Sequence, residues 1–290
     1  MKTKIVKGSD VSKAIGIEMR KDREWLQTAG IKPVLAIVRV GEDKSDAAYE
    51  RGARSFCEKM GITVKQILLQ EDTLPGEMAV RIEALNQDNT VHGILVMRPI
   101  LNPAVAEAAR TAVSPLKDVD GITALSLSGV LTGQKEGFAP CTAQACMEIL
   151  DYLNVDVRGK KVTVVGSSLV VGKPVAMLLL NRFATVTLCH IFTKYVPLEC
   201  RAADIIIAAA GSRGLIGAQH VRAGQIILDV GINVDEENKI CGDIDRKSVE
   251  GIVDVLTPVP GGVGTVTSAV LAKHVIMAAV RQQSCIGRYE

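Results

Sequence analysis

Residues 161–180 combine a short apolar run, two glycines and a helical pattern, and this combination constrains the fold most strongly. Residues 162–165 favour a strand, Gly166 favours a tight turn, and helical spacing of apolar residues begins near Gly172. A helix that follows such a turn offers free backbone N–H groups to an anion, most often the pyrophosphate of a dinucleotide. The residues of the predicted dinucleotide turn are Gly166, Ser167, Ser168, Val171, Gly172 and Pro174.

Two other interpretations of this turn stay open from the motif alone. A phosphate loop of nucleotide hydrolases has four residues between its glycines, followed by Lys and a hydroxyl residue; here five residues intervene, and Pro174 occupies the hydroxyl position. An ordinary strand-to-helix turn would use the glycines only for backbone geometry. Ser168 stands where the dinucleotide pattern has its second glycine, so the motif by itself is a weak signal.

Apolar runs and helical patterns alternate along the whole chain, which predicts parallel α/β sheets. We expect an N-terminal open parallel α/β sheet and a C-terminal Rossmann-type dinucleotide-binding domain, with the domain change in the glycine-containing stretch 129–140. The expected strands are 33–40, 63–69, 93–99, 162–165, 185–189, 204–209 and 225–230. The expected helices are 9–29, 47–60, 77–85, 104–113, 142–153 and 267–281.

Composition narrows the class of protein further. The net charge is +2 and basic residues are interspersed with acids, so the chain lacks the basic field of a nucleic-acid-binding protein. Seven cysteines form no Cys-x-x-Cys pair, which favours reduced thiols and predicts no metal site. No uninterrupted apolar run reaches about 18 residues and the N-terminus lacks an apolar signal core, so we expect a cytoplasmic protein without a membrane partner.

Six stretches, in order along nearly the whole chain, together resemble the methylenetetrahydrofolate dehydrogenase/cyclohydrolase family. The resemblance implies two α/β domains with a folate cleft between them, a last helix that returns to the first domain, and a homodimer. Residues 1–139 with 268–290 then form the folate and catalytic domain, and residues 140–267 the NAD(P)-binding domain. The stretches are Gly-Ile-Leu-Val (93–96), Lys-Asp-Val-Asp-Gly (117–121), Pro-Cys-Thr (140–142), residues 165–174, Asp-Val-Gly-Ile-Asn (229–233) and residues 257–264.

The implied reaction is oxidation of 5,10-methylenetetrahydrofolate to the methenyl compound by hydride transfer to NAD or NADP, a step of one-carbon metabolism. The substrate and cofactor carry the electronic changes, so the protein mainly holds two rings together, which can contribute roughly 7–11 kcal/mol to lowering the barrier.

Tyr49 and Asp120 are implied as the catalytic residues that contact the folate ring. The implied substrate-binding residues are Tyr49, Val96, Met97, Asp120, Pro260, Gly261 and Gly262. The implied cofactor-binding residues are those of the dinucleotide turn with Ile191, Gly231, Ile232 and Thr267. Without the resemblance, Tyr49 would be interpreted as an aromatic at a helix–sheet contact and Asp120 as a turn residue.

The chain departs from the family at two positions that handle protons in the second reaction, hydrolysis of the methenyl compound to 10-formyltetrahydrofolate. The lysine four residues after the tyrosine is Ala53, and the glutamine that partners it is Met97. Arg54 lies about 100° further round the helix and its guanidinium cannot act as a base. We therefore expect the dehydrogenase to survive and the cyclohydrolase to be weak or lost. The full bifunctional enzyme and a non-catalytic folate or nucleotide-binding protein are the alternatives.

The cofactor is expected to be NAD rather than NADP. The family often has an arginine at the position of Ser167, and neither this position nor residues 189–193 supply the Arg or Lys that a 2′-phosphate requires. The acid that usually binds the NAD ribose is also missing at the end of the second strand, so the predicted preference for NAD depends only on the missing Arg or Lys. Lys194, Arg182 or Arg213 could supply a cation from outside these positions.

Overall fold

A computed structural model describes residues 2–41, 44–134 and 137–286, with side chains described at 2–41, 50–134 and 137–283. The chain divides into two compact units, which confirms the predicted two-part α/β fold. Unit 1 comprises Met1–Ala14, Leu131–Gly133 and Thr142–Thr267. Unit 2 comprises Ile15–Val130, Gln134–Cys141 and Ser268–Glu290.

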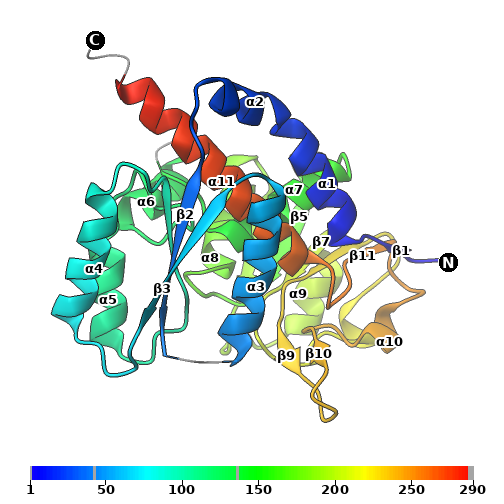
Figure 1. Cartoon of the computed structure of the whole chain (residues 1–290). Helices are drawn as coiled ribbons and strands as arrows, with labels where there is room; N and C mark the ends of the chain where they lie inside the picture. Colours follow the sequence, from blue (N-terminus) through cyan, green and yellow to red (C-terminus); the bar gives the residue numbers. More distant parts are fainter. Residues whose placement is uncertain (1, 42–43, 135–136, 287–290) are drawn as a thin grey trace. The chain divides into compact units, whose positions relative to one another are not determined.

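Unit 2 contains a three-stranded parallel sheet in the order β3–β2–β4. The strands are β2 (Val34–Val40), β3 (Thr63–Leu69) and β4 (Gly93–Val96). Helices α3 (Lys44–Lys59), α4 (Pro75–Gln87) and α5 (Pro103–Ala112) alternate with them, and α4 and α5 lie side by side (Figure 1). Every residue from 34 to 38 of β2 is buried, as expected for a central strand that is covered on both faces.

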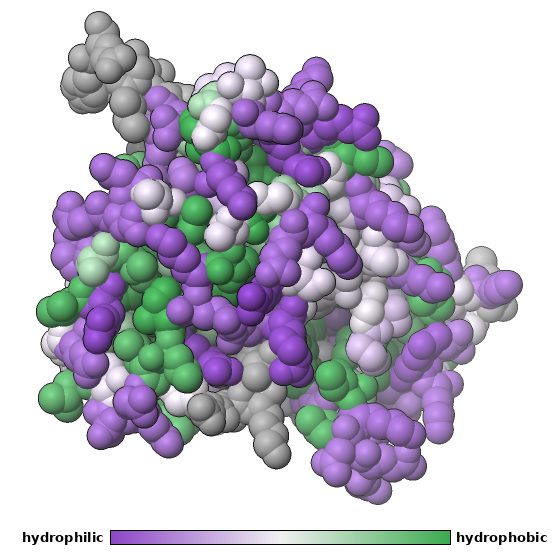
Figure 2. All heavy atoms as spheres, in the orientation of Figure 1, coloured by the Kyte–Doolittle hydropathy of each residue, from purple (hydrophilic) through white to green (hydrophobic). Residues whose placement is uncertain are grey.

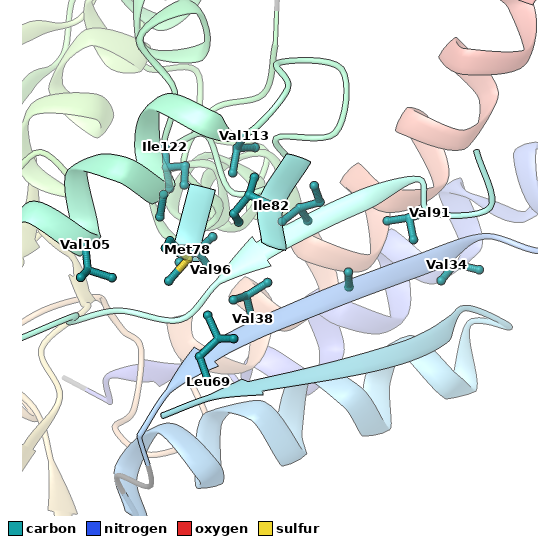
Figure 3. Packing of buried hydrophobic residues seen from close by; sticks show 13 residues of the cluster. Val34, Val38, Leu69, Met78, Ile82, Val91, Val96, Val105, Val113 and Ile122 are labelled. Carbon is teal, nitrogen blue, oxygen red and sulfur yellow. The ribbon is translucent and has the colours of Figure 1, made fainter. Parts of the chain in front are cut away.

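The core of unit 2 forms where one face of this sheet meets α4 and α5 (Figure 3). Side chains alternate along a strand, so Leu35 and Ile37 point to the opposite face, where they are also fully buried. The sheet is therefore a two-sided hydrophobic layer. The main buried members of the cluster in Figure 3 are Val34, Val38, Leu69, Met78, Ile82, Val91, Val96, Val105, Val113 and Ile122.

Unit 1 contains a six-stranded parallel sheet in the order β1–β11–β8–β7–β5–β6. The chain passes from β5 through α8 (Gly172–Asn181) to β6, and then through α9 (Val196–Ala202) to β7 on the other side of β5. The carboxyl end of β5 is thus the point where the strand order reverses, which is where ligands bind in open α/β sheets. The strands are β1 (Lys4–Ile5), β5 (Lys161–Val165), β6 (Thr185–Cys189), β7 (Ile205–Ala208), β8 (Ile226–Asp229) and β11 (Val255–Leu256).

The N-terminal segment differs from its prediction in two respects. The single helix expected at 9–29 is two helices, α1 (Gly8–Glu18) and α2 (Arg20–Thr28). They separate at Met19, whose φ of −81° and ψ of 1° leave the helical region while its side chain stays buried. Residues 1–14, which the sequence places in the first domain, group with unit 1, because β1 pairs with β11. A strand of two residues is too short to leave a periodic signal.

Helix α7 (Cys141–Tyr152) agrees with the helix expected at 142–153 within one residue at each end. Helix α6 (Ala124–Thr132) was not predicted; it begins before the expected connection at 129–140 and extends into it. The remaining short elements are the helices η1 (Ala218–His220) and α10 (Arg246–Val249) and the strands β9 (Asn233–Val234) and β10 (Ile240–Cys241).

The last helix, α11 (Val263–Ile286), starts four residues before its expected beginning. By length and composition it is the one helix in the described part of the chain that could cross a membrane, but 72% of the relevant window is buried, as in a core helix. The view in Figure 2 shows hydrophilic residues over much of the surface, with smaller hydrophobic groups between them.

Candidate active site

The turn after β5 brings backbone segments too close together for any side chain at its two glycines. Gly166 has a φ of +117°, and a Cβ there would overlap the carbonyl oxygen of Ala209. A Cβ on Gly172, the first residue of α8, would overlap the carbonyl oxygen of Gly166. Both positions therefore require glycine, and the turn leaves its backbone open to close approach by a ligand.

Ser168 closes the turn in place of the second glycine of the common pattern. Its hydroxyl accepts the Val171 N–H at 3.1 Å, and its carbonyl oxygen accepts the Lys173 N–H at 3.0 Å. Pro174 lies buried in the first turn of α8, where a missing N–H costs no helix bond. Ser167 is half-buried beside Gly166. The departure from the common motif is thus compensated by hydrogen bonds within the turn.

The turn after β6 is held by its own side chains and presents an apolar residue. The His190 N–H donates to the Thr193 hydroxyl at 2.9 Å, and the Phe192 N–H donates to His190 Nδ1 at 3.2 Å. Ile191, at the tip, is 91% exposed. Residues 190–193 contain neither a cation nor a carboxylate, so this turn has no charged group of its own for a ribose or a phosphate.

Two of the three cations considered as substitutes are already paired. The guanidinium of Arg182 forms two bonds to the Asp151 carboxylate, at 2.5 and 2.9 Å. Arg213 lies 3.5 Å from Glu236. Lys194, adjacent to Thr193, is exposed.

Two buried aspartates, not singled out from the sequence, hold the neighbouring loops of unit 1. Asp243 accepts the N–H groups of residues 210, 211 and 212 at 2.6, 3.0 and 2.8 Å, and the amide of Asn233 at 2.9 Å. Asp229 accepts the N–H groups of residues 231, 243 and 244 at 3.1, 3.0 and 3.2 Å. Burial raises the pKa of Asp229 to about 7, even though these bonds favour its ionised form. Little in the sequence indicates these roles, since Asp229 simply ends an apolar run and Asp243 simply follows Gly242.

The glycine-rich loop after β11 lies at the same carboxyl edge of the unit 1 sheet. The Asp229 N–H donates to the Thr257 hydroxyl at 2.8 Å, and the carbonyl of Gly261 accepts the Gly8 N–H at 2.8 Å. Pro260 and Gly261 are exposed and Gly262 is buried, and all three belong to unit 1. The remaining predicted cofactor residues lie along this edge and at the start of α11: Gly231 is buried, Ile232 is 69% exposed, and Thr267 donates its hydroxyl to the Val263 carbonyl at 3.1 Å.

Unit 2 holds the other predicted substrate residues. Val96 and Met97 end the β4 segment with 2% and 4% exposure, and the Met97 N–H bonds to the Val38 carbonyl at 2.9 Å. Ala53 lies in α3 and is fully buried. Tyr49 also belongs to α3, but its side chain lies outside the described residues. Positions 53 and 97 therefore present only a methyl group and a thioether, neither of which exchanges protons.

Arg54 is turned toward β3 instead of replacing the missing lysine. Its Nε donates to Glu58 at 2.9 Å and its Nη1 donates to Gln66, a residue of β3, at 3.0 Å. This direction agrees with the angular argument from the helix.

The two aspartates of the Lys-Asp-Val-Asp-Gly motif have different surroundings. Asp118 is fully buried and accepts the N–H groups of Ile122 and Thr123 at 2.9 and 2.8 Å and the hydroxyl of Ser126 at 2.7 Å. It caps the start of the following segment. Asp120, by contrast, forms an ion pair with Arg98, whose Nη2 lies 2.6 Å from Asp120 Oδ2. Of the two carboxylates, only Asp120 keeps some exposure, 12% of its side chain.

Behind Asp120 lies a buried cluster that joins the start of α7 to α11. The Cys141 thiol donates to the Val119 carbonyl at 3.2 Å, and His274 Nδ1 lies 2.9 Å from the same oxygen. The Phe138 ring packs on the His274 ring at 4.6 Å between centroids. Burial lowers the pKa of His274 to about 4, so this imidazole is neutral at physiological pH.

In the described part of the chain, no group of three or more His, Cys, Asp or Glu side chains is placed to hold a metal ion. What the geometry does provide is a backbone turn suited to a dinucleotide in unit 1 and a carboxylate–guanidinium pair beside buried apolar residues in unit 2.

Comparison with known proteins gives matches to both parts of the chain. The catalytic domain of tetrahydrofolate dehydrogenase/cyclohydrolase matches residues 6–120, and the NAD(P)-binding domain of the same family matches residues 140–283. The chain belongs to the tetrahydrofolate dehydrogenase/cyclohydrolase family. The resemblance inferred from the six motifs is thereby confirmed, and the NAD(P)-binding domain supports a nicotinamide dinucleotide as cofactor.

Relatives of this family match nearly the full length of the chain. The bifunctional protein FolD of Clostridioides difficile is 44% identical over 283 residues, which cover 98% of this chain and 99% of that protein. The crystal structure of the bifunctional FolD enzyme from Campylobacter jejuni superposes with a TM-score of 0.90 at 36% identity, covering 97% and 99% of the two chains. The dehydrogenase-cyclohydrolase of Trypanosoma brucei, solved with NADP and an inhibitor, gives a TM-score of 0.91 at 29% identity over 97% and 99%.

The buried His274 predicts a pH-dependent contribution to stability. Its folded pKa of about 4 lies below the ordinary 6.5, so its stabilising contribution is full above pH 6.5 and is lost as the pH falls toward 4. His274→Gln removes this titration, so the difference in unfolding free energy between the protein and the variant should shrink by about 2 kcal/mol between pH 7.5 and pH 5. Urea unfolding at the two pH values measures it.

The exposed His190 provides the matched control, because His190→Gln should stay within about 0.5 kcal/mol of the parent at both pH values. A His274→Gln difference that stays constant with pH would contradict the neutral, buried state of this histidine.

Proposed function

We propose that this protein oxidises 5,10-methylenetetrahydrofolate to 5,10-methenyltetrahydrofolate with a nicotinamide dinucleotide as hydride acceptor. The observation that carries the proposal is the dinucleotide turn at Gly166 and Gly172, in a chain that also keeps the Asp120 carboxylate of the folate half. A protein that bound folate alone would not need both sets of residues.

The fit of the cofactor rests on the turn itself. Glycine at positions 166 and 172 allows the turn to close tightly at the start of α8, where N–H groups and the helix dipole favour a pyrophosphate. When bound, the dinucleotide supplies a nicotinamide ring that accepts a hydride. The proposed cofactor contacts are Gly166, Ser167, Ser168, Val171, Gly172, Pro174, Ile191, Gly231, Ile232 and Thr267.

The folate half is proposed to bind through unit 2. Asp120 accepts hydrogen bonds from the pteridine and Tyr49 contacts the ring, while Val96 and Met97 form the buried apolar floor beneath them. Pro260, Gly261 and Gly262 add backbone contacts from unit 1. In domain terms, residues 1–139 with 268–290 serve the folate and catalysis, and residues 140–267 serve the dinucleotide. Hydride transfer needs no acid or base from the protein, which suits a site whose positions 53 and 97 are apolar.

The cyclohydrolase activity distinguishes two candidate functions, a bifunctional enzyme and a dehydrogenase alone. The relatives are named bifunctional proteins, which favours a full dehydrogenase/cyclohydrolase over an enzyme that has lost the second step. The residues at positions 53 and 97 favour a weak or lost cyclohydrolase, because neither can exchange a proton. In the bifunctional candidate a group other than these two must carry the proton. A cytoplasmic homodimer that acts on tetrahydrofolate derivatives completes the proposal.

One assay tests the function. The purified protein is mixed with methylenetetrahydrofolate and NAD or NADP, and reduced cofactor, methenyl and 10-formyl products are followed together. Reduced cofactor should appear at the same rate as the methenyl and 10-formyl products taken together, and the absence of reduced cofactor would contradict the proposal in favour of a non-catalytic binder. Release of 10-formyltetrahydrofolate much faster than in buffer alone identifies the bifunctional enzyme. A release rate equal to that in buffer identifies an enzyme that has lost the cyclohydrolase activity.

NAD is proposed as the preferred dinucleotide. The support is the lack of a cation at Ser167 and Ile191, together with the pairing of Arg182 and Arg213 to acids. Neither Ser167 nor Ile191 offers a charge-assisted bond to a 2′-phosphate, and the exposed lysines nearby are Lys173 and Lys194.

Ile191→Arg should therefore improve the use of NADP. Because Ile191 is 91% exposed, the change leaves the fold intact, and one new charge-assisted bond should lower the KM for NADP at least about tenfold. The KM for NAD should stay within about threefold. Leu180→Arg, at the far end of α8 and 52% exposed, adds the same charge as a control and should change neither constant. An unchanged KM for NADP in Ile191→Arg, or a parent that already prefers NADP, contradicts the assignment.

A further inference from the structure

Arg98 forms an ion pair with Asp120, the aspartate proposed to bind the folate. Its Nη2 lies 2.6 Å from Asp120 Oδ2, and the two side chains keep 32% and 12% exposure. Ile94 of β4 forms an isolated parallel bridge with Asp118. Residues 98 and 120 lie a few positions further along these two segments, where both leave the sheet in the same direction. The pair is therefore built at the carboxyl edge of the unit 2 sheet and remains partly open to solvent.

Two neighbouring charged residues, Lys117 and Asp118, are buried and bonded to the backbone, in contrast to the Arg98–Asp120 pair. Lys117 is buried and its Nζ donates to the carbonyls of Leu85, Asn86 and Asp88 at 2.9, 2.7 and 2.8 Å. Asp118 is likewise fully buried and bonded to the backbone that it caps. Arg98 and Asp120 bond side chain to side chain instead, and this bond does not cap a helix or a strand end.

We infer that Arg98 is a positioning residue for the folate substrate, acting through the Asp120 carboxylate; the inference rests on the proposed function. A carboxylate offers about four acceptor positions, and the Arg98 bond uses one of them. The guanidinium fixes one oxygen of Asp120 with a charge-assisted bond. The remaining acceptor positions are then oriented toward the amino and ring N–H donors of a pteridine.

The other side chains around Asp120 fix the carboxylate less firmly than Arg98 does. Met97 precedes Arg98, and its buried thioether cannot donate a hydrogen bond. The Cys141 thiol contacts Asp120 through a side-chain hydrogen bond, but a thiol is a weak donor. Within the described residues, Arg98 supplies the one ion pair to Asp120. Loss of the guanidinium leaves the carboxylate with this weak bond, and ordering it again is a cost of substrate binding.

The test is a double-mutant cycle on Arg98 and Asp120. Arg98→Gln should raise the KM for methylenetetrahydrofolate at least about tenfold, with the KM for the dinucleotide changed less than about twofold. Arg98→Lys keeps the charge without the planar fork and should fall between. In an Asp120→Asn background, Arg98→Gln should add less than about a twofold change, because its partner is already gone.

Arg110→Gln provides the matched control. Arg110 forms a surface ion pair with Glu107 of α5 at 2.6 Å, in the same unit, so its loss removes the same chemical group from a site without a ligand role. Its KM values should equal those of the parent.

Two results would overturn the inference in an active enzyme: an unchanged folate KM in Arg98→Gln, or a full additional loss in the Asp120→Asn background. If the parent shows no dehydrogenase activity, the proposed function fails, and calorimetric titration with tetrahydrofolate tests Arg98 by itself. A tenfold weaker affinity in Arg98→Gln then supports the positioning role, and an equal affinity overturns it. Circular dichroism of each variant checks the fold, with Arg98→Lys as the milder change.

Discussion

Two buried carboxylates hold together the loops from which the dinucleotide edge of unit 1 is made. Asp243 gathers the N–H groups of residues 210–212 after β7, and Asp229 gathers those of residues 231, 243 and 244. Because buried donors and acceptors left unpaired are costly, each bond also removes a penalty that the loops would otherwise carry. The carboxylates come so near the backbone that a Cβ on Gly231 would overlap Asp243 and one on Gly242 would overlap Asp229. Loop shape at this edge is therefore set by two buried side chains, one from the end of β8 and one from the segment after β10.

The local parts of the fold and site were predictable from sequence, and the non-local parts were not. The strand, turn and helix at 161–180 follow from residues adjacent in the sequence. Glycine is needed at 166 and 172 because a Cβ at either position would overlap the backbone. Asp120 was found because its motif stands in the family's order. The pairing of Arg98 with Asp120 joins residues 22 positions apart, and it depends on the register between the β4 segment and the following strand-like segment. The pairing of β1 with β11 likewise joins the two ends of unit 1 through strands of two residues each.

The substrate half differs in chemical character from the dinucleotide half. Positions 53 and 97 carry buried apolar groups, an alanine and a methionine. Transfer of a hydride between two bound rings depends on their distance and orientation, and it needs no proton from these groups. Hydrolysis of the methenyl product needs a group that gives or takes a proton near the ring. Under the proposed function, a residue other than these two supplies that proton in a bifunctional enzyme.

Direct transfer of the hydride from the folate to the dinucleotide is the central claim, and isotopic labelling tests it most directly. Methylenetetrahydrofolate carrying deuterium on its bridging carbon is turned over with NAD, and the reduced cofactor is analysed by mass spectrometry. The account predicts one deuterium in each reduced cofactor and none released to water. Unlabelled reduced cofactor, or deuterium recovered in the solvent, would contradict it.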